Sequence, residues 1–107
     1  MLTRCCYGLG DTLQFVHYVP SLRRAARDVT VHAQASVARV LEHVEGIDSL
    51  ITRYNNVPPE SYDVAIELSE LPHVFRTTPQ TIPARIPYMH VTPRSFPATN
   101  DINVGLM

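Results

Sequence analysis

The sequence contains no lysine, and its nine basic residues are all arginine, against ten acidic residues. Phosphate-binding loops of the Gly-Lys-Ser/Thr type need a lysine that reaches the phosphates, so the chain cannot carry one. The formal net charge is only −1. A domain that binds nucleic acid through its phosphates needs a strongly basic face, and the composition therefore predicts no nucleic-acid partner.

Cysteine is also scarce, and the only two, Cys5 and Cys6, are adjacent. Neighbouring residues of a strand point to opposite faces, so the pair is poorly placed to form a disulfide, and its spacing does not match a zinc site. The sequence has neither the apolar segment of a signal peptide nor an apolar run of about 18 residues that would span a membrane. We therefore expect reduced core cysteines in a cytoplasmic protein without a membrane span.

The chain has enough apolar residues for a core, 45 % of 107 residues, which fits one small domain. Residues 2–7 form a short apolar run that is typical of a buried strand. Helical spacing starts at Asp11, and Pro20 is expected to end or kink that helix near Tyr18 or Val19. A strand followed by a helix is the first half of a parallel α/β unit.

The same alternation continues along the chain. Val29 to His32 alternate between apolar and polar residues, which predicts a strand, and residues 35–44 have the spacing of a helix that ends at Gly46. Two further strands are expected at 47–52 and 62–68. This order predicts an α/β fold, a Rossmann-like parallel sheet flanked by helices.

The last third of the chain is less regular. Residues 69–75 suggest a short helix with Ser69 as its cap, and five prolines between 79 and 97 exclude a regular helix there. Residues 88–91 are a candidate short strand within this irregular excursion. Residues 102–107 look like the start of another buried strand, so we expect the sequence to be a piece of something longer.

The turn Gly8-Leu9-Gly10-Asp11 follows the first strand, where parallel α/β sheets bind their ligands. Glycine permits a positive φ and a close approach of the backbone to a ligand, and the N–H groups at a helix start favour anions. The dinucleotide-binding motif requires a third glycine, where this chain has Leu13, and an acidic residue at the end of the second strand. Both are missing, which argues against a dinucleotide site.

Asp11 has two compatible interpretations. As the cap or first-turn acid of the helix it would stabilise the fold by about 1 kcal/mol. As a carboxylate at the mouth of a glycine turn it would act as a general base that takes a proton from an attacking hydroxyl. Spacing alone favours the first role, and it does not exclude the second.

Several stretches, in order, resemble one family. The segment "GLGDTLQFVHYVPSL" resembles the opening of the glycosyltransferases related to the ADP-heptose–lipopolysaccharide heptosyltransferases (glycosyltransferase family 9), and most of all the branch attached to tetratricopeptide repeats. "VEGIDSLIT" and "YDVAIELSELPHVFRTTPQTIPARIPYM" are similar to later segments of the same family, and "INVGLM" is similar to the first strand of its second domain. The resemblance covers nearly the whole chain.

This resemblance implies the N-terminal half of a two-domain GT-B fold, with residues 1–91 as the acceptor-side domain and 92–107 as the linker and first strand of a donor domain. Asp11 would be the general base of an inverting transfer from a nucleotide-sugar donor to a glycan or protein acceptor, with no metal and no cofactor. The chain alone, with half a cleft, would be inactive.

The remaining candidate residues surround the turn. The candidate substrate-binding residues are Gly8, Leu9, Gly10, Thr12, Gln14 and Arg76. A solvated helix start is the alternative for Thr12 and Gln14. Arg76 would pair with an anionic acceptor, or else it is a surface arginine or one that holds its loop. Two other functions stay open: a non-catalytic sugar- or phosphate-binding module, and a truncated product without function.

Overall fold

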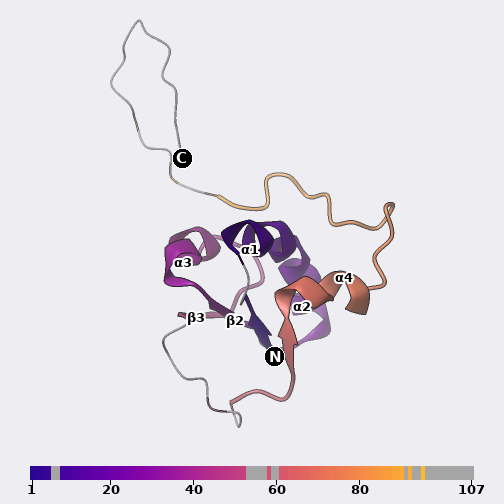
Figure 1. The fold of residues 1–107 in the computed structure, drawn as a ribbon, viewed down its shortest axis with the longest axis horizontal. Coiled ribbons are helices and arrows are strands. Elements are labelled where there is room, and N and C mark those ends of the chain that lie inside the picture. The colour runs from indigo at the N-terminus through magenta and orange to yellow at the C-terminus, as the bar shows by residue number, and fades with distance from the viewer. Residues whose placement is uncertain (6–7, 53–57, 59–60, 91, 93–94, 96–107) are drawn as a thin grey trace, which may run out of the picture.

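The computed structural model describes residues 1–5, 8–52, 58, 61–90, 92 and 95 (Figure 1). The expected donor-domain strand at 102–107 therefore lies outside the described residues. Within the described part, no helix is long and apolar enough to cross a membrane.

Four parallel strands form the sheet, in the spatial order β3-β2-β1-β4. Their bounds are Leu2–Arg4 for β1, Thr30–Ala33 for β2, Ser49–Thr52 for β3 and Ala65–Glu67 for β4. The chain steps outward from β1 to β2 and β3, then returns to the other side of β1 with β4. The predicted α/β fold with a Rossmann-like parallel sheet is confirmed.

All four strands run in the same direction, so their carboxyl ends lie at one edge of the sheet. Arg4, the last residue of β1, is level with His32 of β2 and Glu67 of β4. The turn after β1 therefore starts at this carboxyl edge, in the position where α/β sheets hold ligands.

The predicted first helix is in fact two helices with a tight turn between them. Helix α1 spans Leu9–Phe15, a 3₁₀ turn η1 spans Val16–Tyr18, and α2 spans Val19–Ala25. The predicted break near Tyr18 and Val19 is present, because α1 ends at Phe15 and η1 separates it from α2. Pro20 itself lies in the first turn of α2 and not at the end of a helix. A proline there loses no hydrogen bond, since the first N–H groups of a helix have no partner within it.

Two predicted helix boundaries were wrong. Helix α3 spans Ala35–Leu41 and ends five residues before Gly46, which lies in a later turn with φ of +95°. Ser69 is not a cap, because it lies inside the 3₁₀ turn η3 (Leu68–Glu70), and Glu67 occupies the cap position. Turn η3 leads directly into α4, Leu71–Val74.

The segment after α4 is irregular, as its prolines predict. Residues 88–90 are not a strand, so that expectation was wrong for the part of 88–91 that the structure describes. In Figure 1 the chain runs from α4 past α1 in an extended path. His17 of η1 contacts this path twice, through a hydrogen bond to the Pro83 carbonyl and a ring contact with Tyr88.

One continuous core joins the helices to one face of the sheet. Val31 and Ala33 of β2 and Cys5 after β1 share this face, because alternate residues of a strand point the same way. The buried core residues are Cys5, Val16, Tyr18, Val19, Leu22, Val29, Val31, Ala33, Val37, Leu41, Val44, Leu68 and Leu71. The expectation of a buried core cysteine is confirmed for Cys5, and Cys6 lies outside the described residues.

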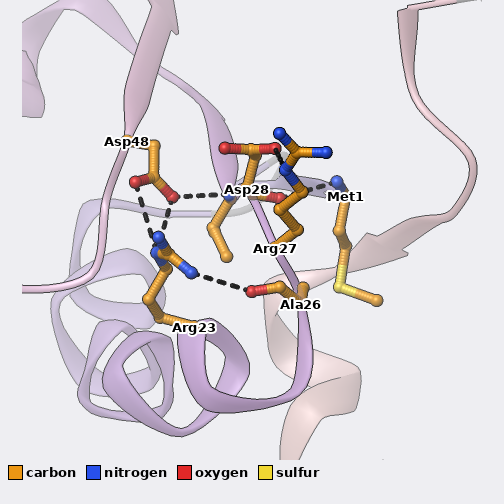
Figure 2. A network of polar contacts seen from close by, with 7 residues as sticks. Met1, Arg23, Ala26, Arg27, Asp28 and Asp48 are labelled. Atoms are coloured by element: carbon orange, nitrogen blue, oxygen red, sulfur yellow. Dashed lines mark hydrogen bonds and ion pairs between the residues drawn. The ribbon is translucent and has the colours of Figure 1, made fainter.

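Arg23, Ala26 and Asp48 form a polar cluster at the opposite, amino edge of the sheet (Figure 2), which also includes the backbone N–H of Val29. The Asp48 carboxylate accepts a hydrogen bond from the N–H of Val29 at 2.8 Å and pairs with the Arg23 guanidinium at 3.0 Å. Arg23 also donates to the Ala26 carbonyl at the end of α2, at 3.0 Å. This Asp48 cluster links α2, β2 and β3 at the amino ends of the strands, whereas the glycine turn lies at their carboxyl ends.

Candidate functional site

The glycine turn at the carboxyl edge shows how Asp11 is held. Gly8 is the N-cap of α1, with an extended backbone (φ −63°, ψ 164°), and Asp11 is the third residue of the helix. One carboxylate oxygen of Asp11 accepts a hydrogen bond from the Gly8 N–H at 3.2 Å. The prediction of a first-turn acid is thus confirmed, while the cap itself is Gly8. Glycine has no side chain, so only the Asp11 half of a capping box is present.

The other side of the Asp11 carboxylate is open. The residue is exposed, and its second carboxylate oxygen has no hydrogen-bond partner among the described residues. One oxygen is therefore held by the backbone, and the other is left without a partner in the described part of the chain. A general base needs this combination of a fixed position and a free lone pair. Because the Gly8 N–H donates to Asp11, it is not available to bind an anion at the start of this helix, as the sequence had suggested.

The two glycines of the turn do not adopt the positive φ that the sequence suggested. Gly8 has a φ of −63°, and Gly10 lies within α1. A Cβ placed on Gly10 would meet no described atom within 4 Å, and one on Gly8 would meet only an Asp11 oxygen at 3.4 Å. Neither glycine is required by the packing of the described chain. Open space beside Gly10 is compatible with the close approach of a ligand.

Thr12 and Gln14 differ in their surroundings. Thr12 is buried, and its hydroxyl donates to the Gly8 carbonyl at 3.3 Å, so it is not part of a solvated helix start. Gln14 is exposed and lies one turn further along α1 than Asp11. Leu9 is a large apolar side chain that is 45 % exposed at the start of the helix. Of these three, Gln14 and Leu9 have exposed side chains, whereas Thr12 is buried.

A small, shallow hollow lies beside Asp11, between α1 and η3. Its lining residues are Arg4, Cys5, Asp11, Thr12, Phe15, Leu68 and Ser69. Sequence reasoning missed Arg4 and Ser69. Arg4 had a usable signal, since it is a charged residue at the end of a strand that leads into the glycine turn. Ser69 had none, because its place depends on how η3 packs against α1.

A larger, open groove lies on the other side of Phe15, along α1 and η1. We call it the proline groove, and its lining residues are Gln14, Phe15, His17, Tyr18, Pro72, Thr77, Thr78, Pro79, Ile82 and Pro83. Phe15 borders both spaces. The groove exists because the proline-rich segment is fixed at its far end, where His17 donates to Pro83 at 3.3 Å and Arg85 pairs with Glu45.

Arg76 stands apart from both spaces. It lines neither the small hollow nor the proline groove, and it makes no ion pair with another described residue. Its backbone has a φ of +49°, because it follows α4 in a left-handed turn that lets Thr77 donate to the Pro72 carbonyl at 2.8 Å. The pairing of Arg76 with an anionic acceptor stays a prediction, and the structure does not bring Arg76 into a space shared with Asp11.

Among the residues that the structure describes, no group of three or more His, Cys, Asp or Glu side chains is placed to hold a metal ion. A comparison of the chain with protein-family models, with curated proteins and with solved structures finds no match.

Proposed function

We propose that the chain is the acceptor-side domain of a glycosyltransferase that moves a sugar from a nucleotide-sugar donor to a hydroxyl of its acceptor. Asp11 is the catalytic base in this proposal, and the chain is inactive without a donor-binding domain. The observation that carries the proposal is the Asp11 carboxylate, anchored by Gly8 on one oxygen and open on the other, at the carboxyl edge of a parallel sheet. The resemblance of the glycine turn supports the same role.

The chemistry follows from this placement. The open oxygen of Asp11 takes the proton of an acceptor hydroxyl, whose oxygen attacks the anomeric carbon of the donor. The bond between that carbon and the nucleoside diphosphate breaks, and the diphosphate leaves with the electron pair. Attack opposite the leaving group inverts the configuration at the anomeric carbon. The Gly8 N–H contributes by holding the carboxylate in one orientation. Correct orientation of the reacting groups raises the rate of such a reaction.

The test is a transfer assay on the longer protein that is expressed from this reading frame together with the DNA that follows it. A panel of nucleotide-sugars is offered with a glycan mixture, and nucleoside diphosphate release and the anomeric configuration of the product are measured. Asp11→Asn retains an oxygen for the Gly8 N–H but no longer takes a proton. We expect it to lower turnover by about 10² to 10⁴, the usual contribution of a general base.

Asp63→Asn is the matched control, because Asp63 is an exposed carboxylate beside the amino edge of the sheet. It should leave turnover unchanged. Wild-type turnover in Asp11→Asn would contradict the catalytic role.

The alternative is a binding module without catalysis, and one observation favours it: the described residues of this chain form the proline groove without any other domain. Binding of a sugar by the chain, with no transfer by the longer product, would support that alternative. A truncated product without function would show neither.

A further inference from the structure

The proline groove has features that point to one class of ligand. We infer that it binds an uncharged oligosaccharide, the part of the acceptor that does not react. This inference rests on the proposed function, since it takes the reacting hydroxyl of that acceptor to lie at Asp11.

The first observation is charge. None of the described residues that line the groove is an arginine, aspartate or glutamate, although the chain has nine arginines and ten acidic residues. Anionic sugars, whether phosphorylated or carboxylated, are held in proteins by charge-assisted hydrogen bonds, usually from arginine. Arg76 is next to Thr77 in the sequence, yet it is not among the lining residues. The groove therefore suits a ligand without charge.

The second observation is the set of polar groups that the groove offers. The Gln14 amide and the Thr77 hydroxyl make no hydrogen bond within the described part of the chain, so both are available to a ligand. An amide and a hydroxyl each donate and accept, as sugar hydroxyls do. Apolar walls from Phe15, Ile82 and Pro83 face the same space. A pyranose ring presents hydroxyls at its edge and C–H groups on its faces, which matches this mixture.

The third observation separates a glycan from a peptide. A peptide that binds by adding a strand does so through hydrogen bonds to backbone groups of the wall that it joins. Here the N–H of Thr77 is bound to Pro72 and that of Thr78 to Thr81, while Pro79 and Pro83 have none. The wall thus has few backbone donors to offer to a peptide. The groove therefore suits a ligand that is bound by side chains of the protein, as sugars are.

The fourth observation is the distance to the proposed base. Gln14 follows Asp11 by three residues on α1, which is about 4.5 Å along the helix axis. Phe15 separates the groove from the small hollow that holds Asp11 and borders both. The groove and the hollow beside Asp11 thus share the Phe15 wall, and a sugar chain in the groove lies one helical turn from the proposed base.

The experiment offers the purified 107-residue chain to an array of neutral, uronate-containing and phosphorylated oligosaccharides and of Pro-rich peptides. The best binder is then titrated into ¹⁵N-labelled chain by NMR. We expect a neutral oligosaccharide to bind, with the largest shifts at Gln14, Thr77 and Ile82. Gln14→Ala and Thr77→Val each remove one hydrogen bond and should weaken binding about fivefold. Gln80→Ala is the matched control, because Gln80 is exposed and does not line the groove.

Preference for an acidic oligosaccharide or for a peptide, shifts centred elsewhere, or no neutral binder at millimolar concentration would each overturn the inference. Asp11→Asn separates it from the proposed function, because that variant should bind in the groove as the wild type does. Neutral binding together with full turnover by Asp11→Asn would refute the catalytic role alone. A preference for acidic oligosaccharides, together with turnover that depends on Asp11, would refute the inference about the groove and leave the catalytic role intact.

Discussion

Replacing Asp48 by alanine tests the polar cluster that joins the amino ends of β2 and β3. The carboxylate accepts the N–H of Val29, a fully buried residue, at 2.8 Å, and a charge-assisted hydrogen bond of this kind contributes about 1.5–3 kcal/mol. The ion pair with Arg23 is partly exposed, at 42 % and 34 % for the two side chains, and adds about 0.2–1 kcal/mol. Alanine removes both, so we expect a loss of about 2–4 kcal/mol.

Asparagine at the same position separates the contribution of the Val29 hydrogen bond from that of the carboxylate charge. Its amide oxygen still accepts from Val29, so Asp48→Asn should lose only the charge and destabilise the fold by about 1 kcal/mol. Urea denaturation followed by far-UV circular dichroism measures both variants, with an unchanged m-value as evidence that the unfolded state is the same.

The control for these variants is Asp28→Ala. The pair of Asp28 with Arg27 is 71 % and 97 % exposed, and its loss should be within about 0.5 kcal/mol of zero. A loss in Asp48→Ala as small as the control, or equal losses for Asp48→Ala and Asp48→Asn, would refute the role given to the Val29 hydrogen bond.

Substitutions at three further positions test two turns and the start of α1. Gly46→Ala should destabilise the chain by about 2 kcal/mol or more, because φ is +95° and the new Cβ would lie 3.2 Å from Arg23 Cβ and 3.3 Å from Pro20 Cα; an unchanged urea midpoint would contradict this. Arg76→Gly should stabilise it by up to about 1 kcal/mol, since glycine adopts the left-handed turn without strain, whereas Arg76→Ala should bring no gain. Gly10→Ala should raise the free energy of unfolding by about 0.5–1 kcal/mol, because α1 gains a better helix former with room for its methyl group. If a ligand approaches Gly10 closely, the same variant binds or reacts more weakly despite its higher stability, and a loss of stability would show that the methyl group has no room.

The sheet was predictable because each strand carries its own signal. The alternation at Val29 to His32 and the apolar runs that follow each helix are local patterns, and parallel pairing is the usual outcome when strands and helices alternate. The helix boundaries were less predictable, because a proline both ends helices and begins them. Nothing local distinguishes Pro20 in the first turn of α2 from a proline that breaks α1.

The candidate site was likewise predictable only in part. Asp11 was identified from its turn, and its first-turn role follows from three-residue spacing after Gly8. The proline groove was not predictable, because it depends on the packing of residues 77–83 against α1 and η1. The hydrogen bond that fixes this packing joins His17 to Pro83, which are 66 residues apart in the sequence. Contacts at such separation leave no periodic pattern to detect.

The central claim is that this chain forms one half of a two-domain transferase, and the DNA on both sides of its reading frame tests that claim most directly. The account predicts that the sequence continues, in frame or after a single frameshift, into a second α/β domain able to bind a nucleotide-sugar. A true stop with no such domain encoded nearby would contradict it, and only ligand binding by the proline groove would then remain as a function for this chain.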